Sequence, residues 1–208
     1  MERIILASGS PRRQEYFRLM GLPFTCMPSS IDETPKPGLS PKQIAEDLAA
    51  RKALAVAAQL PPIDPNPSLT PHSSFPISHL IFGADTIVVL DGEIYGKADS
   101  REEAKAMLLR LSGKRHEVIT AMALHNRQNG KTDCRSVSAE VEFAPLADAD
   151  IEWYLESGEW QGAAGSYRLQ ERGGCLIKSI TGSPSAVAGL PLHEFFVMLK
   201  DNGCRIGA

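Results

Sequence analysis

This chain has few cysteines, and its positive and negative charges are nearly balanced. Four cysteines occur among 208 residues, with no Cys-x-x-Cys pair and no histidine at zinc-ligand spacing. This scarcity argues against a disulfide framework or a structural zinc site and favours a reducing compartment. The net charge is -3, which argues against a generally basic protein, so we expect no stable nucleic-acid complex.

Long apolar runs are also missing. No segment approaches the ~20 apolar residues of a membrane-spanning helix, and the apolar run after Arg3 is too short for a secretory signal peptide. Hydrophobic residues nevertheless make up 43% of the chain, which is enough to bury a core. We therefore expect a soluble, cytoplasmic protein that does not bind membranes.

Several familiar catalytic motifs are absent. The chain contains no Gly-x-Ser-x-Gly elbow, no Gly-x-Gly-x-x-Gly fingerprint and no His-Glu-x-x-His zinc motif. These absences argue against a serine hydrolase of the elbow type, a dinucleotide-binding enzyme and a zinc protease.

Strand-like and helix-like segments alternate along the chain. We expect strands at 3–7, 80–82, 87–90, 93–95, 116–125, 135–143 and 175–180. We expect helices at 11–20, 41–59, 101–112, 149–157 and 191–201. This alternation predicts an α/β fold with a mixed, twisted sheet flanked by helices, in two lobes around a central cleft. Six prolines between 60 and 79 exclude a regular element there, so we expect a surface insertion within one domain over 1–208.

The first expected helix carries two arginines where a helix disfavours them. Ser10 suits the N-cap and Pro11 the first helical position. Arg12 and Arg13 then lie in the opening turn, where the positive end of the helix dipole repels cations. Free backbone N–H groups and two guanidinium groups would together make a phosphate site. The alternative is that both side chains point into solvent.

Three further residues are candidates for a site, each with an ordinary alternative. Lys52 falls within the apolar stripe of helix 41–59, either snorkelling to solvent or lining a cleft. Asp85 follows two small residues between apolar strand segments, so it is either a base or metal ligand at a strand end, or an aspartate in a tight turn. Glu33 lies in an acidic loop that would hold a divalent ion or simply be solvated.

Short motifs in a particular order resemble the Maf family of nucleoside triphosphate pyrophosphatases. They are LASGSPRR at 6–13, GADT at 83–86, GK at 96–97, LSGKRH at 111–116, AGSY at 164–167 with Gln170, and GLPL at 189–192. Each motif is weak alone, but their order is specific and spans nearly the whole chain. Ala163 departs from the pattern, because a basic residue often precedes Ala-Gly in this family.

The resemblance implies an activity and a set of roles. The implied reaction is hydrolysis of a nucleoside triphosphate to the monophosphate and pyrophosphate, with a divalent cation (Mg²⁺, or Mn²⁺) and in a homodimer. Asp85 takes the position of the proton acceptor for the attacking water, and Glu33 and Asp85 match positions beside the metal. The phosphate-binding positions fall on Ser8, Arg13, Lys52 and Lys97.

The resemblance also indicates a substrate. The specificity positions of the dTTP/UTP subgroup fall on Arg12, Thr86 and Gln170, and a glutamine can both donate to and accept from a pyrimidine edge. Arg12 lacks the aromatic ring that would stack on a methylated purine. We expect hydrolysis of dTTP, UTP and modified pyrimidine triphosphates in a house-cleaning role. The alternatives are a pyrophosphatase for 7-methyl-GTP or another nucleotide, and a non-catalytic regulator of septum formation.

Overall fold

The computed structural model describes residues 3–62 and 79–204. The strands are β1 (Ile4–Leu6), β2 (Phe24–Cys26), β3 (Leu80–Leu90), β4 (Glu93–Tyr95), β5 (Arg115–Asn126), β6 (Lys131–Phe143) and β7 (Ile177–Thr181). The helices are α1 (Pro11–Leu19), α2 (Pro41–Gln59), α3 (Arg101–Leu111), α4 (Asp148–Glu156), α5 (Pro184–Val187) and α6 (Leu192–Asp201), with a short 3-10 helix η2 (Arg172–Leu176). Most of the proline-rich insertion expected at 60–79 lies outside the described residues. Within the described ranges, no helix is long and apolar enough to cross a membrane.

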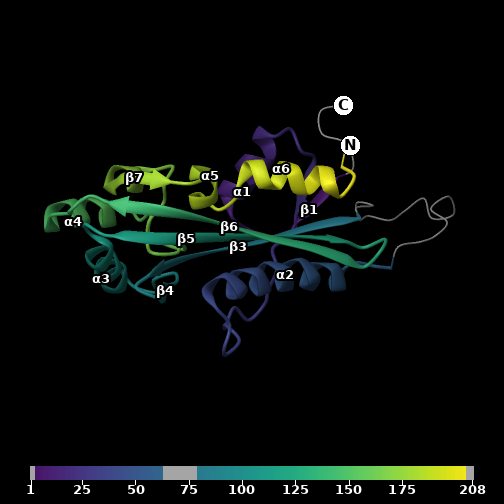
Figure 1. Cartoon of the computed structure of the whole chain (residues 1–208), viewed down its shortest axis with the longest axis horizontal. Coiled ribbons are helices and arrows are strands. Elements are labelled where there is room, and N and C mark those ends of the chain that lie inside the picture. The colour runs from purple at the N-terminus through teal and green to yellow at the C-terminus, as the bar shows by residue number, and fades with distance from the viewer. Residues whose placement is uncertain (1–2, 63–78, 205–208) are drawn as a thin grey trace.

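These strands form one mixed sheet with helices on both faces (Figure 1). The strand order is β2-β1-β3-β5-β6-β7, and β4 pairs with β3. β1 runs parallel to β2 and β3, whereas the other pairs are antiparallel. Helix α2 lies on one face, and α1 and α6 lie on the other. The expected mixed α/β fold is confirmed, while its division into two lobes stays a prediction with which this arrangement is compatible.

The core is divided by the sheet. On one face the aromatic rings of Phe17, Phe82 and Phe195 pack against one another between the sheet and helices α1 and α6. On the opposite face three of the seven buried residues of α2 are alanines, including Ala49 and Ala53. A third cluster of buried residues lies at the end of the long strands where α3 and α4 pack.

Local sequence signals place the helix starts. Ser40 and Gln43 form the expected reciprocal capping box of α2, with the Ser40 N–H donating to Gln43 Oε1 at 2.9 Å. Helix α4 begins one residue before the expected span of 149–157. The N-cap is Ala147, whose N–H donates to the side chain of Asp150 at 2.8 Å, so Asp148 is already helical.

Strand β3 differs from the expectation around Asp85. Residues 80–90 form one continuous strand rather than two segments, and Asp85 pairs with Ala121 in its middle. Asp85 is therefore neither at a strand end nor in a tight turn. Gly83 is required for helix packing, because a Cβ there would lie 2.3 Å from the Ala49 carbonyl oxygen. Glycine lets α2 approach the sheet at this point.

A gap in one edge of β3 positions the site. β1 pairs with β3 as far as Phe82, and β4 pairs with the same strand from Val88 onward. Among the described residues, no strand pairs with 83–87 on this edge. Successive side chains of a strand point to opposite faces, so a cavity at such a gap can be lined from both faces of the sheet. Asp85 and Thr86, which are neighbours in β3, both line the cavity that opens here.

Candidate active site

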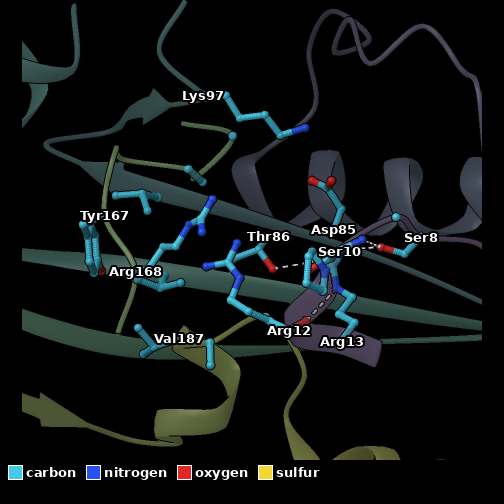
Figure 2. Close-up of a pocket in the computed structure, with 18 of the residues that line it drawn as sticks. Ser8, Ser10, Arg12, Arg13, Asp85, Thr86, Lys97, Tyr167, Arg168 and Val187 are labelled. Atoms are coloured by element: carbon cyan, nitrogen blue, oxygen red, sulfur yellow. Dashed lines mark hydrogen bonds between the residues drawn. The ribbon is translucent and has the colours of Figure 1, made fainter. Parts of the chain in front are cut away.

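A cavity of about 440 Å³ opens at this gap in the sheet edge (Figure 2). It brings together eight of the nine site residues expected from the sequence: Ser8, Arg12, Arg13, Glu33, Lys52, Asp85, Thr86 and Lys97. Gln170 does not line the cavity. Its side chain is exposed and donates to the hydroxyl of Tyr16 on α1 at 3.4 Å.

On the α2 side of the cavity, Asp85, Lys52, Glu33 and Lys97 form an ion-pair chain. Lys52 Nζ lies 2.6 Å from Asp85 Oδ1 and 3.0 Å from Glu33 Oε1, and Lys97 Nζ lies 3.3 Å from Glu33 Oε2. Lys52 and Asp85 are buried, whereas Glu33 and Lys97 are exposed. Burial raises the pKa of Glu33, but the hydrogen bonds and charges of the two lysines outweigh it and hold the pKa below its ordinary value.

The ion-pair chain decides between the two interpretations of Lys52. Its ammonium does not snorkel to solvent, because the residue is only 7% exposed and its Nζ contacts two carboxylates. Gly83 makes this contact possible, since it allows α2 to lie close to the strand that carries Asp85. A buried cation of this kind is stable only when its charge is compensated.

Arg13 holds several elements of the site together. Its Nε donates to the Gly189 carbonyl at 2.9 Å, its Nη1 to Ser8 Oγ at 3.1 Å and its Nη2 to Thr86 Oγ1 at 3.1 Å. Burial lowers the pKa of Arg13 to about 10, so the side chain remains a cation at neutral pH. These bonds join the loop after β1, strand β3 and the segment before α6. Whether Arg13 also contacts phosphate stays a prediction.

The Thr86 hydroxyl is already engaged within the protein. It lies 2.8 Å from Thr120 Oγ1, and Thr120 in turn donates to the Ala186 carbonyl at 2.8 Å. Because Thr120 uses its own proton on that carbonyl, Thr86 donates to Thr120 and accepts from Arg13. Thr120 belongs to no motif and was not anticipated from the sequence.

The start of α1 offers an anion site. Ser10 is the N-cap, but its side chain makes no cap hydrogen bond. The N–H groups of Arg12 and Arg13 lie at positions that have no intrahelical acceptor. Open N–H groups at a helix N-terminus favour a bound anion, and both residues line the cavity.

Arg168 is the cationic site residue that sequence reasoning missed. It lines the cavity, and Figure 2 shows its guanidinium beside that of Arg12. The available signal was weak: a cation two residues before Gln170, within the AGSY motif region where Ala163 had suggested a missing charge.

Two carboxylates are available for a divalent cation. Asp85 and Glu33 contact the same Lys52 ammonium, so they lie near each other. No group of three or more metal-ligating side chains occurs within 3–62 and 79–204. Mg²⁺ is commonly held by one or two carboxylates together with substrate phosphates and water. The pair therefore fits Mg²⁺ in the presence of a polyphosphate rather than a metal held by the protein alone.

The cavity thus combines a cluster of cationic side chains with neighbouring carboxylates in a mixed α/β fold. A family model described as "Maf-like protein" matches residues 3–202. The chain belongs to the Maf family.

Three similar proteins share the same name. The dTTP/UTP pyrophosphatase of Symbiobacterium thermophilum is 42% identical over 209 residues, covering 99% of this chain and 97% of the relative. The protein of that name from Shewanella sp. is 43% identical over 207 residues, covering 97% and 99%. That of Neisseria gonorrhoeae is 40% identical over 205 residues, covering 99% and 96%.

Proposed function

We propose that this protein hydrolyses dTTP and UTP to the nucleoside monophosphate and pyrophosphate. The observation that carries the proposal is the placement of Asp85 beside Lys52 in a cavity that also holds Arg12 and the open N-terminus of α1. The names of the similar proteins support the choice of substrate. Modified pyrimidine triphosphates belong to the same proposal.

The triphosphate would be held by groups at the start of α1 and at the exposed end of the ion-pair chain. The N–H groups at the start of α1 and the guanidinium of Arg12 face the cavity, and Ser8 contributes a hydroxyl. Lys97 is exposed at the end of the ion-pair chain away from Asp85, and it would exchange its contact with Glu33 for a phosphoryl oxygen. Together these groups would oppose the charge of the substrate and of the leaving pyrophosphate.

Asp85 would orient the attacking water and accept its proton. The water oxygen forms a bond to phosphorus as the anhydride between the α and β phosphates breaks, and pyrophosphate leaves with the electron pair. The bond from Lys52 fixes one oxygen of Asp85, so the other oxygen is left to contact water. We also propose that Asp85 and Glu33 bind Mg²⁺, or Mn²⁺, with the substrate. The bound metal would neutralise negative charge on the phosphates.

The basis of pyrimidine selection stays part of the proposal. Arg12 lines the cavity, whereas the Thr86 hydroxyl is engaged by Arg13 and Thr120, and Gln170 lies outside the lining residues. Base recognition by Gln170 would therefore require the nucleotide to extend past the cavity toward Tyr16. The homodimer implied by the resemblance is likewise proposed, and light scattering of the purified protein tests it.

The test is release of pyrophosphate from a panel of nucleoside triphosphates with Mg²⁺, using wild type and Asp85→Asn. We expect dTTP and UTP to be cleaved most efficiently. The substitution removes the proton acceptor, so we expect kcat to fall on the order of 10²-fold or more. Asp47→Asn is the matched control, because Asp47 pairs with Arg51 on α2 and does not line the cavity.

Other outcomes separate the alternatives. Preferred cleavage of 7-methyl-GTP would keep the reaction and overturn the substrate. If no nucleotide were cleaved, or if Asp85→Asn behaved like Asp47→Asn, the proposed reaction would be wrong. Partner binding, as in a regulator of septum formation, would then be the better account.

A further inference from the structure

Arg12 and Arg168 are two cations that share one part of the cavity with little to compensate them. Figure 2 shows both guanidinium groups pointing into it. Among the described residues, the side chain of Arg12 has no hydrogen bond or ion pair. Burial and the charge of Arg168 both lower the pKa of Arg12. Like charges in a partly buried site are unfavourable unless an anion joins them.

The backbone that carries Arg168 is firmly placed. The two residues at 165 and 166 have φ of 64° and 62°, and Ser166 is a rare non-glycine residue with positive φ. On the other side, a Cβ at Gly173 would lie 2.4 Å from the Arg168 carbonyl oxygen, so only glycine permits this packing. Backbone strain such as that at Ser166 clusters at active sites and ligand-binding sites.

The guanidinium of Arg168 is only partly satisfied in the free protein. Its Nη2 donates to the Gln161 carbonyl at 2.6 Å, and its Nη1 reaches Glu171 only at 3.5 Å. Its Nε is buried without a hydrogen-bond partner in the described structure. Unsatisfied buried polar atoms are rare in native proteins, so this nitrogen shows that the protein does not fully satisfy the Arg168 guanidinium.

Glu171 lies where an anion between the two arginines would be expected. It lines the same cavity and forms the long ion pair with Arg168, and its charge also acts on Arg12. The carboxylate is exposed, 44% for its side chain, so it can move away at little cost. A phosphoryl group has more acceptor oxygens and more charge than a carboxylate, so it would compete for both guanidinium groups.

We propose that Arg168 is a phosphate-binding residue that, with Arg12, holds one phosphoryl group of the substrate, and that Glu171 occupies this place until the phosphate arrives. The identity of the substrate in this proposal rests on the proposed function, whereas the arrangement of the charged groups does not. It predicts that removing the charge of Arg168 and removing the charge of Glu171 change the affinity for polyphosphate in opposite directions. Loss of Arg168 weakens polyphosphate binding, whereas loss of the Glu171 charge strengthens it.

The test is equilibrium binding of inorganic tripolyphosphate without metal, measured by calorimetry. This probe has no base, so it reports only the phosphate contacts. We expect Arg168→Gln to raise the Kd about 10-fold or more and Arg168→Lys to recover part of the loss, because lysine keeps the charge but not the forked donor geometry. We expect Glu171→Gln to lower the Kd about 3-fold, since it removes the competing charge.

Arg172→Gln is the matched control. It removes the same charge four residues from Arg168, but Arg172 stacks on Trp153 and does not line the cavity. We expect its Kd to stay within about 2-fold of wild type. Equal effects of Arg168→Gln and Arg172→Gln would overturn the proposal, as would weaker binding by Glu171→Gln. The latter variant keeps the proposal testable even if Arg168→Gln fails to fold.

The two proposals fail separately. If wild type hydrolyses dTTP but Arg168→Gln leaves tripolyphosphate binding unchanged and alters only the preference among bases, Arg168 reads the base and the phosphate role is wrong. If wild type cleaves no nucleotide but the binding series follows the expected order, the phosphate site stands and the proposed reaction is wrong.

Discussion

The two sides of the cavity differ in whether their charged side chains are compensated by groups of the protein. In the ion-pair chain on the α2 side, each lysine faces a carboxylate, and the Lys52–Asp85 pair is buried. On the other side, Arg12 and Arg168 lie beside each other, and the long ion pair from Glu171 to Arg168 brings the nearest negative charge. The ion-pair chain is internally compensated, whereas the arginine pair is completed only by an anion from outside.

This difference separates the ion-pair chain, which stabilises the site, from the arginine pair, which is available to bind the substrate. A compensated buried pair keeps Asp85 in one orientation before any ligand binds, so little reorganisation is needed during the reaction. Uncompensated cations cost stability in the free protein, and that cost is recovered when a polyanion binds. Three predictions test this division, from the largest expected effect to the smallest.

The ion-pair chain should be essential for stability. Lys52→Met leaves two carboxylates without their shared cation, and removal of one partner of a buried pair costs about 3–5 kcal/mol. Urea unfolding followed by circular dichroism measures the change. Lys36→Met is the control, because Lys36 pairs with Asp47 at an exposed site and such pairs contribute about 1 kcal/mol or less. Equal losses in the two variants would contradict the structural role of the chain.

The adjacent arginines of α1 should behave differently. Arg13 makes three hydrogen bonds to Ser8, Thr86 and Gly189, so Arg13→Gln should lower the free energy of unfolding by roughly 3 kcal/mol. Arg12 makes none to the described residues, so Arg12→Gln should change stability by less than about 0.5 kcal/mol while raising KM for dTTP.

Thermal or urea unfolding of both variants, with KM measured for Arg12→Gln, makes the comparison directly. A large stability loss in Arg12→Gln would show that Arg12 belongs to the structural side of the cavity. An unchanged KM in the same variant would remove it from the substrate-binding side.

Behind the arginine side, His116 should make stability depend on pH. Its Nε2 lies 2.8 Å from the hydroxyl of Tyr167, which lines the cavity, and burial lowers the pKa of His116 from 6.5 to about 4. The folded state therefore favours the neutral ring. As the pH falls below 6.5 the unfolded chain takes up a proton first, so stability is present above that value and is lost toward pH 4.

Between pH 7.5 and pH 5 this single group should remove about 2 kcal/mol of stability. The measurement is the free energy of unfolding across that range for wild type and His116→Gln, since the difference between the curves cancels the other titrating groups. Parallel curves would show that His116 does not contribute the pH dependence.

Local chemistry made parts of the site predictable. The N-cap and Pro11 place two arginines at the start of α1, and the Ser40 capping box fixes the frame in which Lys52 falls on the buried face of α2. Both inferences depend on residues within a few positions of one another, where helix geometry leaves few choices. The order of motifs identified the family, which the family model confirms.

Other features depended on pairing between distant segments. Asp85 lies inside a continuous strand, and it reaches the cavity only because β1 ends and β4 begins on the same edge. The small size of Gly83 serves helix α2, which precedes it by some thirty residues. No local pattern carries this information, because it is set by which strands meet and where they stop.

By itself the sequence determined the α/β class, the helices α1, α2 and α3 with their starting residues, and most of the charged groups that line the cavity. Those properties follow from periodicity, capping and composition, which act over short distances. Only the tertiary structure decided which charges compensate one another and which remain available. Arg12 and Arg13 are chemically identical neighbours, yet Arg13 is bound by three protein oxygens, whereas Arg12 lies beside Arg168 in the cavity. That assignment comes from the surrounding elements, because the partners of a charge are supplied by segments distant in the chain.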